Sequence, residues 1–161
     1  MEQVVKAFEE EKKAIRTICA ESGMTGIKVL EALNGRGSVR VFGKEEVLPL
    51  FKDLVGLGVM LVLVEHQGCV FEIKTHFPDG AEGHGYYNFK LEQETGISGH
   101  MDIKNISHVA VVSETFHNME SKNWWFIHEN GEVMFKVYLG RNADRSLKEN
   151  QLEVFNKWLN K

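Results

Sequence analysis

Hydrophobic residues in the first part of the chain recur at helical spacing. Between charged residues, apolar side chains return every three to four positions, which is the pattern of a helix with one buried side. A short segment, 38–42, alternates instead and predicts a strand, because successive side chains of a strand face opposite ways. Helices are predicted over residues 4–22, 27–33 and 44–56. Residues 1–56 therefore form a helical N-terminal part with one short strand.

After residue 56 the sequence pattern predicts strands separated by turns. His66-Gln67-Gly68 and Asn130-Gly131 are hairpin signals, and Pro78-Asp79-Gly80 marks a further turn. Short connections of this kind require antiparallel pairing, because parallel neighbours need long crossovers. Strands are predicted over residues 59–65, 69–74, 86–91, 97–103, 107–113, 124–128 and 132–138.

These patterns predict one α+β domain over residues 1–161. Its centre is a large antiparallel β-sheet, contributed by residues 57–140. The N-terminal helices and a C-terminal helix, 146–160, pack on this sheet, and we expect them to cover one of its faces.

The charge balance narrows the class of partner. The chain has 23 acidic and 19 basic residues and a net charge of −4, which disfavours nucleic acid and anionic membrane surfaces as partners. The N-terminus is acidic, and no apolar run approaches the roughly 20 residues of a membrane span. We therefore expect a cytoplasmic protein without membrane insertion. Cys19 and Cys69 form no CxxC pair and are interpreted as buried thiols.

Side chains that can bind iron concentrate between His84 and His100. Alternation within strand 86–91 directs Tyr87 toward the core with Phe89, and leaves Tyr86 on the open face. Imidazole and phenolate are the ligands that bind iron where no thiolate cluster is present.

The side chains of the next predicted strand, 97–103, alternate between the two faces in the same way. Met101 and Ile103 face the core, while His100 faces the open side. If the two strands pair about a turn at residues 92–96, His100 lies near Tyr86 on one face. The other histidines carry weaker signals: His66 at a hairpin tip, where solvation is the usual state, His108 in the core, and His76, His117 and His128 at strand ends or loops.

The histidine spacings match no zinc pattern, and the chain has no HExxH motif, nucleophile elbow or phosphate-binding glycine loop. From the chemistry alone, two interpretations stay open. The segment between His84 and His100 either holds an iron or haem group, or it is an ordinary structural sheet.

Four segments occur in a fixed order: His-Gly-Tyr-Tyr-Asn-Phe (84–89), Gly-Ile-Ser-Gly-His-Met (96–101), Lys-Asn-Ile-Ser-His-Val-Ala-Val-Val (104–112) and Phe-Lys-Val-Tyr-Leu-Gly-Arg (135–141). Together they resemble the HutX/ChuX-type cytosolic haem-utilisation carriers, which are related to the HemS/ChuS haem-handling proteins. The resemblance covers about residues 59–160.

The resemblance implies a function and an assembly. Members of this family form homodimers through their antiparallel sheets and bind haem as cargo, not as a catalytic cofactor. They are thought to pass it to a haem-degrading partner such as a HutZ-type enzyme. The chain itself would then not be an enzyme. The alternative is a haem-degrading oxygenase, as described for larger two-repeat relatives. That alternative is disfavoured because the chain has one unit and its best ligand is a tyrosine, whereas oxygen-activating haem enzymes usually use histidine or cysteine.

The resemblance also implies site residues. In the HutX branch the first tyrosine of the Gly-Tyr-Tyr-Asn motif is the axial iron ligand, which corresponds to Tyr86. In the ChuX branch two histidines were implicated. One corresponds to His100, the alternative axial ligand; the other falls at Glu65, with His66 one position away.

Four further residues are candidate haem contacts. His84 begins the tyrosine motif. Arg141 is a candidate for pairing with a haem propionate, as are Lys90 and Arg145. An equally good interpretation of Arg141 is a structural ion pair where the last strand leads into the C-terminal helix.

Overall fold

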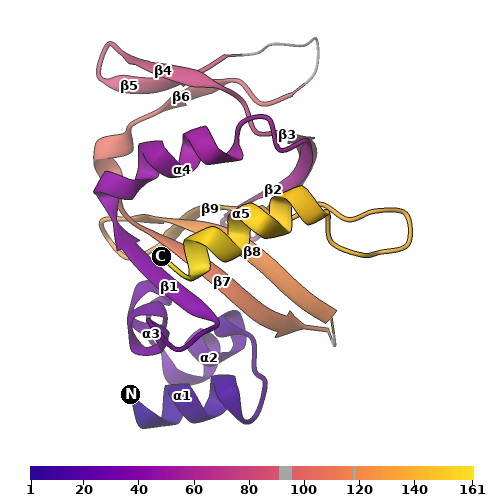
Figure 1. The fold of residues 1–161 in the computed structure, drawn as a ribbon. Coiled ribbons are helices and arrows are strands. Elements are labelled where there is room, and N and C mark those ends of the chain that lie inside the picture. Colours follow the sequence, from indigo (N-terminus) through magenta and orange to yellow (C-terminus); the bar gives the residue numbers. More distant parts are fainter. Residues whose placement is uncertain (91–95, 118) are drawn as a thin grey trace.

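The strands form two antiparallel sheets that lie one above the other (Figure 1). This computed structural model describes residues 1–90, 96–117 and 119–161. Within these residues the larger sheet has six strands in the order β1-β7-β8-β9-β2-β3, and the smaller has the order β4-β5-β6. The predicted α+β class with a large antiparallel sheet is confirmed. The strands of the larger sheet are β1 (Val39–Gly43), β2 (Val59–His66), β3 (Cys69–His76), β7 (Ile106–Phe116), β8 (Met119–His128) and β9 (Val133–Tyr138).

The N-terminal helical part is more finely divided than the sequence pattern suggested. The predicted helix over 4–22 is two helices, α1 (Glu2–Glu9) and α2 (Ile15–Ser22). Between them Lys12 has a φ of 54°, and the carboxylate of Glu114 on β7 accepts a hydrogen bond from the Ile15 amide at 2.9 Å. A tertiary contact thus satisfies a free amide at the start of α2. The other α-helices are α3 (Gly26–Leu33), α4 (Val47–Leu54) and α5 (Glu149–Leu159).

Helices cover both faces of the larger sheet, so the prediction that they cover one face was wrong. Val109 and Val111 of β7 pack with α4 and α5, whereas Ala110 and Val112 pack with α1, α2 and α3. Consecutive apolar residues in a strand indicate burial on both faces, and this run carried that signal. None of the helices in the described residues is long and apolar enough to cross a membrane.

The smaller sheet contains a strand that the sequence reading missed. β4 (Gly80–Gly83) begins at the predicted turn and pairs with β5 (Tyr86–Phe89). The connection is the two-residue turn His84-Gly85, with φ of 55° and 84°, which is the geometry of a type I′ hairpin. β5 in turn pairs with β6 (Gly99–Met101), a shorter strand than the predicted 97–103. Leu91 and, except for Gly96, the predicted turn over 92–96 lie outside the described residues.

The cysteines are less buried than expected. Cys69 is exposed at the tip of the β2–β3 hairpin, opposite His66, and Cys19 is half-buried on α2. β3 lies at the edge of the larger sheet, where nearly all its side chains are exposed. The apolar residues of this segment therefore indicated a strand, but they did not indicate whether its side chains are buried.

Candidate ligand-binding site

Tyr86 and His100 lie together on the outer face of the smaller sheet. The register pairs Asn88 with His100 and Tyr87 with Met101, so alternation directs Tyr86, Asn88 and His100 to the same side. The Tyr86 and His100 ring centroids are 6.2 Å apart at an interplanar angle of 63°. Tyr86 is 47% exposed and Tyr87 only 6%. The predicted sorting of these side chains is confirmed.

The inner face of the smaller sheet is anchored by an aromatic cluster. Phe51 of α4 has its ring centroid 5.2 Å from Tyr87, 5.6 Å from Phe89 and 5.3 Å from Phe126 of β8. α4 thereby joins the two sheets (Figure 1). Gly80 completes the packing, because a Cβ there would lie 2.5 Å from the Tyr87 ring. The strands that carry the outer face are therefore tightly packed on their inner face.

Burial distinguishes the two neighbouring tyrosines chemically. Desolvation raises the pKa of the Tyr87 phenol, and the charges of Asp79 and Glu82 raise it further. A phenol whose ionised form is disfavoured is a poor phenolate ligand. Tyr86, on the open face, is the tyrosine that a ligand can reach.

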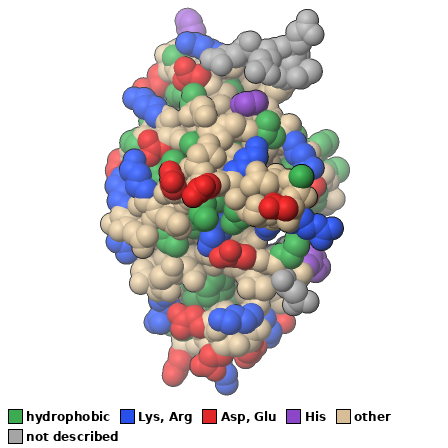
Figure 2. All heavy atoms as spheres, turned by 45° about the vertical axis from the view of Figure 1, so that its right-hand side comes forward, with side chains coloured by type: hydrophobic (Ala, Val, Ile, Leu, Met, Phe, Trp, Pro, Cys, Tyr) green, Lys and Arg blue, Asp and Glu red, His purple; other side chains and the backbone are tan. Residues whose placement is uncertain are grey.

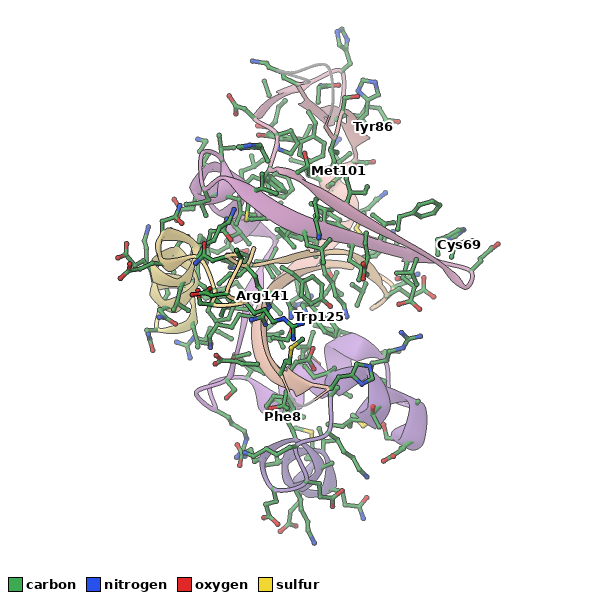
Figure 3. The ribbon with its side chains drawn as sticks, turned by 90° about the vertical axis from the view of Figure 1, so that its right-hand side faces the viewer. Phe8, Cys69, Tyr86, Met101, Trp125 and Arg141 are labelled. Atoms are coloured by element: carbon green, nitrogen blue, oxygen red, sulfur yellow. The ribbon has the colours of Figure 1, made fainter. Side chains whose placement is uncertain are left out.

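An apolar cavity of about 360 Å³ lies between the inner side of the smaller sheet and the β2–β3 hairpin, and of the outer-face pair His100, but not Tyr86, lines it. Its lining includes Val62, Val64 and Ile73 from the hairpin, and Phe89, His100 and Met101 from the smaller sheet. Figure 3 shows Met101 below Tyr86, with the hairpin extending outward to Cys69.

The floor of this cavity continues onto exposed apolar surface. Phe71 is opposite Val64 in the register and so shares its face, and it is 59% exposed, while Ile73 is 37% exposed. Sequence reasoning missed this part of the site, since it treated β3 as an ordinary strand. Exposed apolar side chains beside a cavity are typical of surfaces that bind apolar ligands.

His84 and His66 occupy different hairpin turns. His84 is exposed in the turn that leads into Tyr86, and so belongs to the same hairpin as the site. His66 lies at the other end of β2, opposite Cys69, and Figure 3 separates Cys69 widely from Tyr86. Within this protomer the fold does not bring His66 to Tyr86 and His100.

Arg141 closes a loop far from Tyr86 (Figure 3). Its guanidinium donates to the backbone carbonyls of Arg145 at 2.8 Å and Glu120 at 2.6 Å. Its backbone also forms an isolated bridge with Leu147. Arg141 thus has a structural role here, although its partners are carbonyls and not the carboxylate of the expected ion pair. Lys90 directly follows β5, and its backbone amide donates to the Asp79 carbonyl at 2.8 Å.

The described residues contain no cluster of three or more histidine, cysteine, aspartate or glutamate side chains placed to hold a metal ion. On the face drawn in Figure 2, acidic and basic side chains are interspersed among the described residues. This face therefore carries no basic stripe of the kind that a phosphate backbone selects.

Comparison with known proteins identifies relatives of the chain. The family model for haem utilisation ChuX/HutX matches residues 40–158. The chain is 32% identical over 155 residues to the intracellular heme transport protein HutX of Vibrio cholerae serotype O1, a match that covers 96% of this chain and 79% of HutX.

Solved structures agree at the level of the fold. The structure of the heme binding protein ChuX is similar with a TM-score of 0.82 at 23% identity, over 92% of this chain and 91% of ChuX. ChuS, an E. coli heme oxygenase, is similar with a TM-score of 0.76 at 12% identity, over 93% of this chain but 47% of ChuS. The resemblance found in the sequence motifs is confirmed by the family model and by the identity to HutX: the chain belongs to the ChuX/HutX haem-utilisation family.

Proposed function

We propose that this protein is an intracellular haem carrier that binds ferric haem with Tyr86 as the axial ligand. The observation that carries the proposal is the pair of exposed rings, Tyr86 and His100, together with an apolar cavity that His100 lines. His100 is the alternative axial ligand. The identity to a protein named for intracellular heme transport supports the carrier role.

The site offers an apolar surface for the porphyrin of haem and an oxygen ligand for its iron. The porphyrin is flat and largely apolar, and the exposed Phe71 and Ile73 offer it an apolar surface continuous with the cavity. The phenol of Tyr86 offers iron an oxygen ligand. An anionic phenolate favours ferric over ferrous iron, which holds haem in the state that does not activate oxygen.

A carrier must release its cargo, and we propose that a haem-degrading enzyme, such as one of the HutZ type, receives it. The competing function is haem degradation by this chain itself. The fold likeness to a heme oxygenase raises that possibility, but this chain corresponds to about half of that enzyme. Tyrosine ligation also argues for transport, since oxygen-activating haem enzymes usually use histidine or cysteine.

A haemin titration followed by reduction separates the two functions. Purified protein is titrated with haemin, the Soret band is recorded, and ascorbate is added in air. A carrier keeps its Soret band, whereas conversion to a biliverdin-like spectrum would show an oxygenase and overturn the proposal.

The ligand is tested by removing one oxygen atom. Tyr86→Phe should abolish the ferric phenolate signature and weaken haem binding. Tyr87→Phe makes the same chemical change on the neighbouring, buried tyrosine of β5 and serves as the matched control. A wild-type spectrum and affinity in Tyr86→Phe would exclude this ligand, and His100→Ala would then test the alternative.

We also propose that two copies of the chain associate through the larger sheet. The apolar cluster under α1, α2 and α3 takes its strand residues from β1, β7, β8 and β9. On the same face, Leu61, Leu63 and Tyr138 are half-buried, and they offer a second copy partly apolar surface. Light scattering after size exclusion should give a dimer, and Leu63→Glu should give monomers. A monomeric wild-type protein would contradict the assembly without affecting the haem proposal.

A further inference from the structure

Asn88 lies between the turn of the smaller sheet and the ring of His100. Its side-chain nitrogen, Nδ2, donates to the backbone carbonyls of Ala81, Gly83 and Tyr86, at 3.3, 3.0 and 3.2 Å. Carbonyl oxygens only accept hydrogen bonds, so the orientation of this amide is determined. Its oxygen, Oδ1, then faces His100 Nδ1 at 2.6 Å.

This orientation determines where the proton of His100 resides. An amide oxygen has no hydrogen to donate, so the 2.6 Å contact is a hydrogen bond only if His100 Nδ1 carries the hydrogen. In the neutral imidazole, Nε2 then holds the lone pair. Nε2 makes no hydrogen bond to any residue that the structure describes, and it lies on the side of the ring away from Asn88. His100 is an exposed residue, and it also lines the apolar cavity.

We propose that Asn88 is a positioning residue that holds His100 as the Nδ1–H tautomer and presents the Nε2 lone pair on the face shared with Tyr86. This role rests on the proposed haem-binding function and deepens it. A histidine that binds a metal through one nitrogen commonly donates a hydrogen bond from the other, which fixes both ring orientation and tautomer. Asn88 supplies that acceptor before any ligand arrives, so the site requires no rearrangement of His100.

A simpler role for Asn88 is closure of the β4–β5 turn through its three carbonyl contacts. Two substitutions separate the roles. Asn88→Asp keeps an acceptor for His100 Nδ1–H but cannot donate to the three carbonyls. Asn88→Leu removes both the acceptor and the donor. If Asn88 only closed the turn, the two variants would be equally impaired.

The first readout is the tautomer of His100 in the haem-free protein, measured by long-range ¹H–¹⁵N correlation at a pH where the ring is neutral. The wild-type protein and Asn88→Asp should show a protonated Nδ1, and Asn88→Leu should lose this signature. A wild-type His100 protonated on Nε2 would overturn the proposal whether or not the protein binds haem.

The second readout is haem affinity and the ferric spectrum. Tyr86→Phe leaves His100 as the ligand, and in that background Asn88→Leu should bind haem about 10- to 100-fold more weakly, which is the usual cost of losing a residue that orients a metal ligand. Asn88→Asp should retain most of the affinity. Asn142→Leu is the control, because the side-chain amide of Asn142 likewise donates a hydrogen bond, to Ser146 Oγ in the loop of Arg141. Equal losses in the two Asn88 variants would assign Asn88 to turn closure alone. A wild-type protein that fails to bind haem would instead refute the function proposed for the whole site, while the tautomer measurement would stand.

Discussion

In both sheets, successive side chains of a strand point to opposite faces. The sheets differ in whether both of these faces are covered. In the larger sheet, Val109 and Val111 pack on one side of β7 while Ala110 and Val112 pack on the other. In the smaller sheet, Tyr87 is buried and Tyr86 is 47% exposed. Both faces of the central strands of the larger sheet thus contribute to stability, whereas the smaller sheet leaves one face free to bind a ligand.

The difference shows how a small sheet can leave one face accessible. A small sheet is stable when it has a hydrophobic face or packs against a helix, and here α4 packs on the inner face through Phe51. Because support and binding use opposite faces, stability and ligand affinity should respond to different substitutions. The predictions below test that separation.

The largest effect is expected in the centre of the larger sheet. Phe126 is fully buried and stacks on Phe135 with ring centroids 4.3 Å apart. Phe126→Ala should lower the free energy of unfolding by about 3–5 kcal/mol, through lost burial and the cavity left behind. Urea unfolding measures it. A loss below about 1 kcal/mol would show that this sheet is not the main source of stability.

A smaller effect, on binding and not on folding, is expected at Phe71. Phe71→Ala should weaken haem binding by about tenfold, since an aromatic contact with the porphyrin contributes about 1–2 kcal/mol. Its free energy of unfolding should change by less than about 0.5 kcal/mol, because the side chain is 59% exposed. Val70→Ala, on the opposite face of the same strand, is the matched control. Equal losses of affinity in the two variants would place haem elsewhere.

A pH-dependent effect is expected at Glu114, which joins β7 to α2. Burial raises the pKa of its carboxyl above the usual 4.5, opposed by the Ile15 hydrogen bond and the charge of Lys136. The folded state thus favours the protonated form, and the stability that this gives is present below about pH 4.5 and is lost as pH rises through the folded pKa. Glu114→Gln keeps an oxygen for the Ile15 amide and does not ionise. Its unfolding free energy, relative to wild type, should therefore increase between pH 4.5 and 7.

The control for this titration is Glu153→Gln on α5, where the side chain is exposed. Its stability relative to wild type should stay constant over the same range. A Glu114→Gln variant that becomes relatively less stable as the pH rises would mean that its negative charge stabilises the fold.

The smallest effect is expected for the ion pair between α2 and the β2–β3 hairpin. Arg16 and Glu65 are 3.2 Å apart, with side chains 70% and 42% exposed. Arg16→Ala should change the free energy of unfolding by about 0–1 kcal/mol, because water and salt screen exposed pairs. Thermal unfolding at low and high salt measures it. A loss of several kcal/mol would show that this contact organises the N-terminal helices.

Local patterns predicted most of the strands because strand periodicity depends on neighbouring residues alone. They failed where the decisive contact was distant. After the break between α1 and α2, the Ile15 amide donates to Glu114, which lies 99 residues further along the chain. The polar start of β8 over residues 119–123 resembles a loop but pairs with β7. β4 was missed because its four residues include two glycines and no apolar pattern.

The candidate site, too, depends partly on local sequence patterns and partly on contacts between distant residues. The sequence alone determined that Tyr87 points inward and that Tyr86 and His100 point outward, because alternation is a local property of each strand. Only the tertiary structure decided that β5 and β6 pair in the register that brings these two rings together, and that the β2–β3 hairpin lies beside them.

The tertiary structure also decided which candidates stay apart. His66 and Arg141 are compatible with a haem site by residue type, but one lies at a distant hairpin end and the other closes a loop. Residue type and periodicity are properties of the chain, whereas the distance between remote residues depends on strand order. Residue types and periodicity therefore indicated the chemistry of the candidate site. The arrangement of the two sheets decided which of the candidate residues lie close together.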